Sequence, residues 1–388
     1  LIKVTTIIGY GSPNKADSHD VHGAALGPDE VTATRQNLGW EYREFEVPGD
    51  ALSYFRKAVD RGAKYEEEWN QLFSEYKSKY PEDAATLERM VSGKLPEDWA
   101  NILPKYTPES KKDATRNQSG ATLNAIAGVL PELIGGSADL APSNKTLLKG
   151  LGDFQKGQYQ NRNVRSIRLS ALAEAGVIWV MTHDSIALGE DGPTHQPVEH
   201  IASLRLIPQL IVIRPADGNE TSGAYKVAVE KAKASHPQPT LLALSRQGLP
   251  NLAGSSIDGV AKGAYIVSDS EGTPEVIIIG TGGETYQCVE AAEKLRAEGK
   301  KVRVVSMPCW ELFEEQDAAY KESVFPVSVK KRLAVEAGVS FGWHRYVTDE
   351  GATLSIDTFG ASAPGGVVLE KYGFSVDNIV AKAKELLG

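Results

Sequence analysis

Short apolar runs that alternate with helical stretches constrain the fold of this 388-residue chain more than any other feature. Between about residues 108 and 255, a helical stretch near 114–128 precedes apolar runs at 177–181, 210–213 and 240–244. Short apolar runs that contain β-branched and aromatic residues are typical of buried strands. Strands that alternate with helices predict a parallel sheet covered by helices, so we expect an α/β fold.

The same alternation returns in the last third of the chain, from about residue 259, and predicts a second small α/β sheet. A glycine-rich segment at 280–285 follows its first apolar run, but it lacks the full spacing of a dinucleotide-binding turn. We therefore expect a tight strand-to-helix turn there. The predicted strands lie at 276–279, 302–305 and 333–335, and the predicted helices at 286–297 and 312–321.

The first hundred residues have a different pattern. Residues 2–8 are strand-like, whereas residues from about 50 to 104 are charged and helical in pattern, with few strand signals. Tyr65 and Trp69 are spaced for one face of an amphipathic helix, and the glutamates at 66–68 are most simply a solvated face. This region predicts a helical connector between domains.

Composition excludes several classes of protein. A hydrophobic fraction of 41% with 24% charged residues is ordinary for a soluble globular protein, and a net charge of −9 argues against a nucleic-acid partner. No apolar run approaches membrane-spanning length. The only cysteines, Cys288 and Cys309, allow no disulfide framework or cysteine-rich zinc site, so we expect core thiols and a reducing compartment. A first residue Leu1 instead of Met leads us to expect a processed or truncated start.

The loop at 182–197 is the densest chemical segment, with two histidines, three carboxylates and three hydroxyls between glycines and prolines. It follows a predicted strand, and open parallel sheets bind ligands beyond the carboxyl ends of their strands. The loop is therefore a candidate site. The alternative is an ordinary solvated turn in which His183 is a satisfied structural residue. We favour the site because turns rarely need two histidines.

Three further residues suit a phosphate monoester: Arg246 after the strand at 240–244, Arg116 near the start of a helix, and Ser143. Each alone is more often a surface residue, so only their convergence on one cleft would favour binding.

His19 and His22 could be taken as a metal pair, but no third ligand is obvious, so we expect a substrate or anion contact. For His19, plain solvent exposure has nearly equal weight. Asp217 and Glu220 fit a helix capping box and are interpreted as structural.

Together these motifs resemble the transketolases, in particular the photosynthetic type, over essentially the whole chain. The motifs that carry the resemblance lie at 11–15, 21–23, 131–140, 182–197, 214–220 and 244–247.

The resemblance implies successive parallel-sheet domains of the thiamine-diphosphate-enzyme type. It divides the chain into the tail of a diphosphate-binding domain at 1–50, a helical connector at 51–107, a pyrimidine-binding domain at 108–255 and a C-terminal transketolase domain at 256–388. Most of the diphosphate-binding domain is missing, including its Gly-Asp-Gly stretch.

A second departure from the family lies inside the pyrimidine-binding domain. The family's residues after 161–165 include a glutamate that activates thiamine and an aromatic cradle for its ring, and several dozen such residues are absent. Deleting a central strand and helix would cost more free energy than the whole unfolding free energy of a typical domain. We therefore expect the natural polypeptide to carry these residues.

The resemblance also implies roles for single residues. His195, His183 and His22 correspond to catalytic histidines, and His22, Asp139 and His183 to cofactor-binding residues. No metal ligand is implied within this chain. The residues that correspond to the substrate-binding set are Arg116, Ser143, His183, Asp191, His195 and Arg246.

For a complete enzyme, the resemblance implies reversible ketol transfer from a ketose phosphate to an aldose phosphate in the Calvin cycle and the pentose phosphate pathway. Thiamine diphosphate and Mg²⁺ or Ca²⁺ would be the cofactors, with metal ligands in the missing N-terminal domain. Sugar phosphates and a second copy in a homodimer would be the partners, with neither nucleic acid nor membrane. The chloroplast stroma is the implied compartment, with the cytoplasm as the alternative.

Two other functions stay open from the sequence. One is a related thiamine enzyme, such as a deoxyxylulose-phosphate synthase or a pyruvate dehydrogenase β subunit. The other is a non-catalytic, transketolase-derived fragment whose pocket is a relic.

Overall fold

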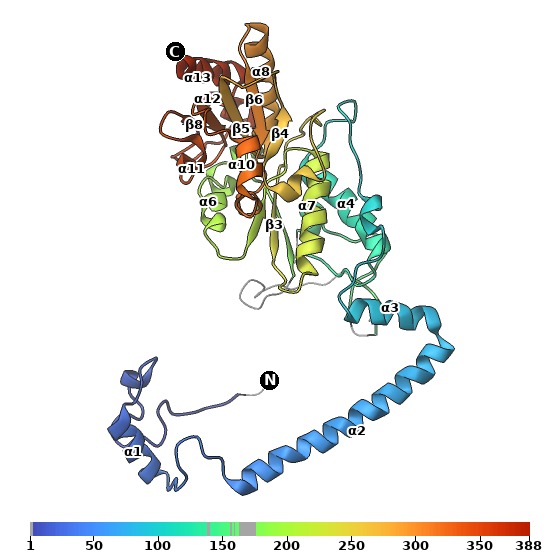
Figure 1. Cartoon of the computed structure of the whole chain (residues 1–388), viewed down its shortest axis with the longest axis vertical. Coiled ribbons are helices and arrows are strands. Elements are labelled where there is room, and N and C mark those ends of the chain that lie inside the picture. Colours follow the sequence, from blue (N-terminus) through green and yellow to red (C-terminus); the bar gives the residue numbers. More distant parts are fainter. Residues whose placement is uncertain (1–2, 138–139, 156, 159, 163–175) are drawn as a thin grey trace. The chain divides into compact units, whose positions relative to one another are not determined.

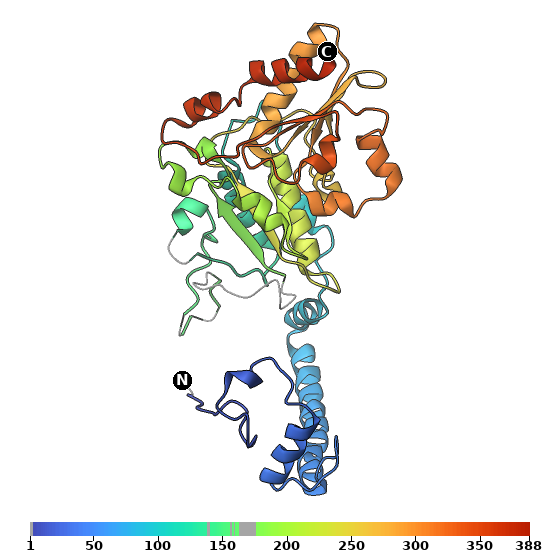
Figure 2. The same ribbon diagram turned by 90° about the vertical axis from the view of Figure 1, so that its left-hand side faces the viewer.

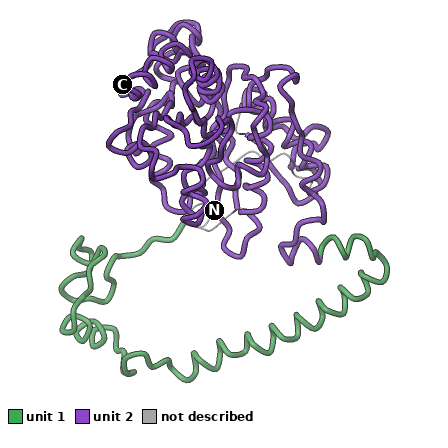
Figure 3. Tube along the Cα trace, turned by 45° about the horizontal axis from the view of Figure 1, so that its top comes forward, with its two compact units in different colours: residues 1–87 green, residues 88–388 purple. Residues whose placement is uncertain are grey.

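The structure, a computed structural model, describes residues 3–137, 140–155, 157–158, 160–162 and 176–388. The chain divides into two compact units, Leu1–Leu87 and Glu88–Gly388 (Figure 3). Among the described residues no helix combines the length and the apolar character needed to cross a membrane.

The first unit is helical. It contains α1 (Pro28–Asn37), α2 (Gly49–Lys79) and most of α3 (Pro81–Val91), which confirms the predicted helical character after residue 50 (Figure 1). The strand prediction at 2–8 is wrong, because residues 3–8 form no strand. A single apolar run needs a neighbouring strand to pair with, and the described part of this unit provides none.

The second unit begins with a three-stranded sheet in the order β1-β3-β2, and all its pairs are parallel as predicted. Alternate residues face opposite sides. Ile211 and Ile213 pack with α4 and α7, whereas Val212 packs with Ile201 of α6. The elements are α4 (Thr115–Val129), α5 (Ala141–Asn144), β1 (Ile178–Thr182), α6 (His200–Arg205), β2 (Ile211–Ile213), α7 (Gly218–Ala232) and β3 (Thr240–Leu244).

A five-stranded sheet follows in the order β4-β6-β5-β7-β8, parallel except for β4, which runs antiparallel to β6. Helices cover both faces (Figure 2). The strands are β4 (Tyr265–Ser268), β5 (Val276–Gly280), β6 (Val302–Ser306), β7 (Arg332–Val335) and β8 (Ala352–Leu354). The helices are α8 (Thr285–Ala297), α9 (Trp310–Glu314), α10 (Ala318–Val324), α11 (His344–Val347), α12 (Gly365–Lys371) and α13 (Val376–Leu387).

The predictions for this second sheet were right for β5, β6, β7 and α8, whereas β4 and β8 were not predicted. The single helix predicted at 312–321 is wrong. It is two helices, because Asp317 caps α10 by accepting a hydrogen bond from the Tyr320 N–H at 2.7 Å. Cys288 and Cys309 are fully buried free thiols, as predicted.

The capping box at the start of α7 is confirmed and also joins the two sheets. Asp217 accepts from the Glu220 N–H at 3.0 Å, and Glu220 accepts from the Ala216 N–H at 2.7 Å. The other carboxylate oxygen of Glu220 accepts a hydrogen bond at 2.7 Å from the hydroxyl of Tyr265, a residue of the second sheet. A fully buried acid thus joins the two sheets.

Candidate functional site

The site lies where the three parallel strands of the first sheet end. β1, β3 and β2 end at Thr182, Leu244 and Ile213, so the residues that follow them emerge at one edge. These residues are His183, Ser245 with Arg246, and Arg214. This confirms that the 182–197 loop leaves the carboxyl end of a strand, where open parallel sheets bind ligands.

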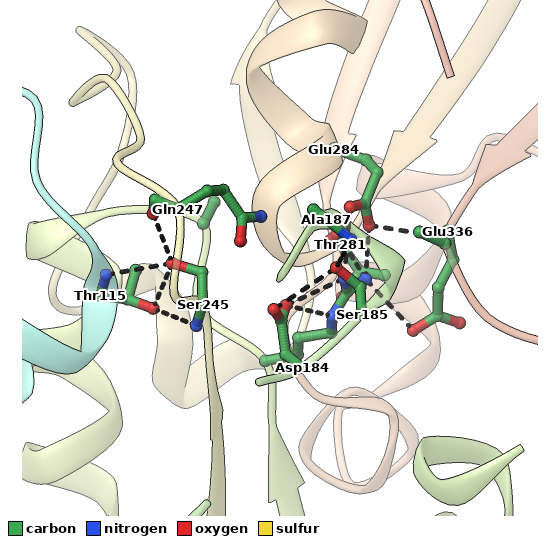
Figure 4. A network of polar contacts seen from close by, with 12 residues as sticks. Thr115, Asp184, Ser185, Ala187, Ser245, Gln247, Thr281, Glu284 and Glu336 are labelled. Atoms are coloured by element: carbon green, nitrogen blue, oxygen red, sulfur yellow. Dashed lines mark hydrogen bonds and ion pairs between the residues drawn. The ribbon is translucent and has the colours of Figure 1, made fainter. Parts of the chain in front are cut away.

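A pair of hydroxyl residues attaches helix α4 to this edge (Figure 4). Thr115 Oγ1 accepts from the Ser245 N–H at 2.7 Å, Ser245 Oγ accepts from the Thr115 N–H at 3.1 Å, and the two oxygens lie 3.0 Å apart. The next residue on each side is an arginine. The contact therefore brings Arg116 and Arg246 to the same place.

Arg246 lies beside the 182–197 loop. Its guanidinium is 2.9 Å from Asp191 Oδ2 and donates a longer bond, at 3.3 Å, to the Leu188 carbonyl. Both side chains of the ion pair are more than a third exposed, at 37% and 41%, so the pair adds little to stability. Arg246 is therefore accessible to an anionic ligand, which would compete with Asp191 for it.

Among the described residues, Arg116 makes fewer hydrogen bonds than Arg246 does. Its Nη1 donates to the Ser143 carbonyl at 3.4 Å, and its buried Nε has no hydrogen-bond partner among the described residues. Burial, and then the positive charge of Arg246, hold the pKa of Arg116 below its usual value. Two neighbouring guanidinium groups favour an anion, although Asp191 beside Arg246 and Asp113 near Arg116 offset part of their charge. The contact made by Ser143 is through its backbone carbonyl.

His183 sits beside these arginines in an unusual backbone conformation, with φ at 68°. Its Nδ1 is 2.8 Å from Thr182 Oγ1. Burial lowers the pKa of His183, the charges of Arg116 and Arg246 lower it further, and Asp191 opposes them. The imidazole is thus neutral near pH 7 and can accept a proton or a hydrogen bond from a ligand hydroxyl.

His195 completes the loop at its exposed end. It closes the short 3-10 helix η4 (Pro193–His195), and its Nδ1 is 2.9 Å from Thr194 Oγ1. The positive charge of protonated His195 is one of the influences that lower the pKa of His183, so the two imidazoles act on each other electrostatically. The structure therefore brings together Arg116, Ser143, His183, Asp191, His195 and Arg246.

The C-terminal part of the chain holds this loop. Gln196 Nε2 donates to the Ala361 carbonyl at 3.0 Å, and the Ser362 hydroxyl donates to the Glu190 carbonyl at 2.6 Å. Gly189 has φ at 89°, and a Cβ there would lie 2.7 Å from the backbone nitrogen of Gly365. The loop is therefore packed backbone to backbone against a distant segment.

Two further predicted residues stay predictions, because the structure does not place them relative to this group. His22 belongs to the first unit, where its N–H donates to the His19 carbonyl at 3.0 Å, and His19 is exposed. Asp139 lies outside the described residues. Within the described ranges, no three His, Cys, Asp or Glu side chains are grouped so as to hold a metal ion.

Sequence reasoning missed a buried charge network beneath the loop (Figure 4). Arg214 contacts Asp184 at 2.9 Å, Glu284 at 2.5 Å and Glu336 at 3.6 Å. Arg205 forms a two-bond contact with Glu336, at 2.9 and 3.0 Å. Arg214 and Glu336 directly follow predicted strands. The same position after a strand drew attention to the 182–197 loop, so it could have identified these two residues as well.

Fold and site together define an α/β protein. Its candidate site, at the carboxyl edge of the first sheet, is positively charged and suits an anionic ligand. Three family models match the chain. They are the transketolase thiamine diphosphate binding domain at residues 1–96, the transketolase pyrimidine binding domain at 157–251 and the transketolase-like C-terminal domain at 263–375. The chain belongs to the transketolase family.

Individual relatives agree with these models. The chain is 62% identical to a transketolase of the cyanobacterium Nostoc sp., with all of this chain and 63% of the relative aligned. It is 52% identical to a chloroplastic transketolase of Craterostigma plantagineum, of which it covers 82%. A transketolase structure from Leishmania mexicana matches 99% of this chain with a TM-score of 0.89 and 38% identity, over 61% of its own length.

The chain spans only part of several of these relatives, for example 57% of the chloroplastic transketolase of Solanum tuberosum. The alignment to the Nostoc relative also covers 426 positions against 388 residues in this chain, so at least 38 positions of that relative face gaps. This length difference agrees with the several dozen family residues found missing in the sequence.

Proposed function

We propose that this chain forms the sugar-phosphate half of a transketolase active site, in which a two-carbon ketol unit passes reversibly from a ketose phosphate to an aldose phosphate. The observation that carries the proposal is the convergence of Arg116 and Arg246 with His183 and Asp191 at one sheet edge. Transketolase structures from Pichia stipitis that are 38% identical to this chain are described as complexes with sedoheptulose 7-phosphate and fructose 6-phosphate.

In this proposal the two arginines bind the phosphate, and Ser143 lies at the same end. Arg246 is partly exposed and can exchange Asp191 for the phosphate, while Arg116, which makes one long hydrogen bond to Ser143, adds a second positive charge beside it. His183 and Asp191 contact the sugar hydroxyls, with His183 as the neutral acceptor. His195 moves a proton at the reacting oxygen, a task suited to an imidazole because its two ring nitrogens can donate and accept a proton.

The described residues fit the sugar phosphate better than the whole cofactor. Among the described residues, no three His, Cys, Asp or Glu side chains are grouped so as to hold the metal ion that accompanies the cofactor. We propose that the ligands of Mg²⁺ or Ca²⁺ lie outside the described residues, that His22, His183 and Asp139 face the cofactor, and that His22 also takes part in catalysis. Bound thiamine diphosphate supplies the carbanion chemistry of the reaction.

The wider setting is also part of the proposal. We propose the domain division 1–50, 51–107, 108–255 and 256–388, a homodimer as the working assembly, and a role in the Calvin cycle and the pentose phosphate pathway. Relatives named as chloroplastic and a cyanobacterial relative support the chloroplast stroma as the compartment.

The test is product analysis of the purified chain with thiamine diphosphate, Mg²⁺, xylulose 5-phosphate and ribose 5-phosphate. Sedoheptulose 7-phosphate should form if the chain or its homodimer is catalytic. Products from pyruvate and glyceraldehyde 3-phosphate instead would indicate the deoxyxylulose-phosphate synthase type.

The non-catalytic alternative is favoured by one observation, the 38 positions of the Nostoc relative that this chain lacks. Calorimetry distinguishes it, since a relic fragment should neither bind thiamine diphosphate nor form product.

A further inference from the structure

Asp184 lies between the site loop and the buried charge network. It directly follows His183, whose φ is 68°, and its own side chain is 2% exposed. Ser185, the next residue, caps the short helix η3 (Ile186–Leu188) by accepting a hydrogen bond from the Ala187 N–H. A left-handed histidine is uncommon and persists where the surrounding structure stabilises it, and the buried side chain of Asp184 is a neighbouring group that can do so.

The residue that anchors Asp184 is Arg214, at the end of β2. Its side chain is 1% exposed, and its Nε donates to Asp184 Oδ2 at 2.9 Å. Among the described residues it is the cation that touches all three buried carboxylates of the network, Asp184, Glu284 and Glu336. A guanidinium can serve these partners at once because its donors lie in a fixed planar fork.

Two of those carboxylates belong to the second sheet. Glu284 lies in the turn between β5 and α8, and Glu336 directly follows β7. Arg214 is also enclosed there, because its N–H donates to the Pro308 carbonyl at 2.9 Å and a Cβ on Gly282 would lie 2.7 Å from its Nε. The guanidinium therefore occupies one position, set by the second sheet.

We propose that Arg214 is a positioning residue through which the C-terminal sheet fixes Asp184 and thereby the pose of His183 at the site. This deepens the proposed function and rests on it for the role of His183. It gives the C-terminal domain a definite task, since the carboxylates of that domain hold the arginine that orients a loop of the other domain.

Arg214→Lys in the full 388-residue chain tests the proposal, because lysine keeps the charge and loses the planar fork. The matched control is Arg332→Lys, since Arg332 is also buried but donates to backbone carbonyls, among them those of Val329 and Tyr346. The first readout is the NMR titration of the His183 ring, assigned by its loss in His183→Asn. The second is the affinity for inorganic phosphate.

Arg214→Lys should move the His183 titration toward the usual histidine value, because the ring loses part of its burial and leaves the field of Arg116 and Arg246, and should weaken phosphate binding several-fold. Arg332→Lys should change neither the His183 titration nor the phosphate affinity, even if it lowers thermal stability as much as Arg214→Lys does. If Arg214→Lys does not fold, Glu284→Gln, which removes one carboxylate charge at nearly constant shape, takes its place with the same expected shift.

An unchanged His183 titration in the folded Arg214 or Glu284 variant would overturn the proposal, as would an equal shift in the Arg332 control. Phosphate binding by the unmodified chain is measured as a separate experiment. If this chain does not bind phosphate, the result counts against the proposed function. The His183 titration, measured without ligand, still decides the role of Arg214.

Discussion

Two strands of the second unit differ in how completely they are enclosed. Every residue of β5, at the centre of the second sheet, is buried, whereas β1, at the edge of the first sheet, is only partly buried and exposes 45% of Met181. The candidate site loop nevertheless follows the less enclosed strand. The second sheet and the chain after it provide the carboxylates and the 360–365 segment that hold the site loop. Support and chemistry are thus divided between the two sheets.

The largest expected effect comes from matched truncations in the two sheets. Ile278→Ala in β5 should cost about 2–5 kcal/mol of unfolding free energy, because the residue is fully buried between strands and helices. Ile178→Ala in β1 should cost roughly half as much, since that side chain is only partly buried. Urea unfolding measures both. Equal losses would show that β1 is as fully enclosed in solution as β5.

The second prediction concerns Glu220, which joins the sheets. Burial, followed by the charge of Asp217, raises the pKa of Glu220 to about 7 from 4.5. The folded state therefore binds this proton more tightly than the unfolded state does. Its stabilising contribution is complete below about pH 4.5 and is lost as the pH rises through 7, a change of roughly 3 kcal/mol.

Urea titrations from pH 4.5 to 8 measure this dependence, with Glu220→Gln as the comparison. The variant should lose most of the fall in stability across that range, because glutamine carries no titrating proton. The same slope in parent and variant would contradict the assignment of the high pKa to Glu220.

A smaller effect is expected at the exposed side of the site. Arg246→Ala should weaken the binding of inorganic phosphate about tenfold, the usual consequence of losing a charge-assisted hydrogen bond. Arg345→Ala is the control, because its guanidinium is 63% exposed and lies on α11, outside the site. Calorimetry compares the two, and similar losses would mean that only net charge matters.

The smallest expected effect is a pH dependence from His183. Its lowered pKa means that the ring gains its positive charge at a lower pH than an ordinary histidine does. The affinity for sulfate, whose charge stays constant in mild acid, should therefore rise a few-fold as the pH falls below the usual histidine pKa and rise less in His183→Gln. Identical profiles would remove His183 from the anion site.

Much of this comparison was predictable from local sequence. The strands β3 and β5 are apolar runs whose own composition specifies a buried strand, and both were placed correctly. β4 and β8 were missed because they are short and only part of each is buried, so their strand character depends on distant partners. The break between α9 and α10 had a local signal in the capping residue Asp317, which was overlooked.

The candidate site also has one part that local sequence predicts and one part that it does not. The 182–197 loop stands out because its polar groups are contiguous and follow a strand. The network around Arg214 does not, since Asp184 and Glu284 lie 30 and 70 residues away from it. No local pattern pairs residues at such distances, and only the folded chain shows that these charges compensate one another.

The Thr115–Ser245 contact also has a consequence for the order of folding. It joins residues 130 positions apart, so the two arginines meet only after a long loop has closed. A chain still emerging from the ribosome therefore cannot form the proposed anion site until both ends of that loop have been synthesised. Phosphate that binds only the closed form should slow unfolding and leave the rate of folding nearly unchanged.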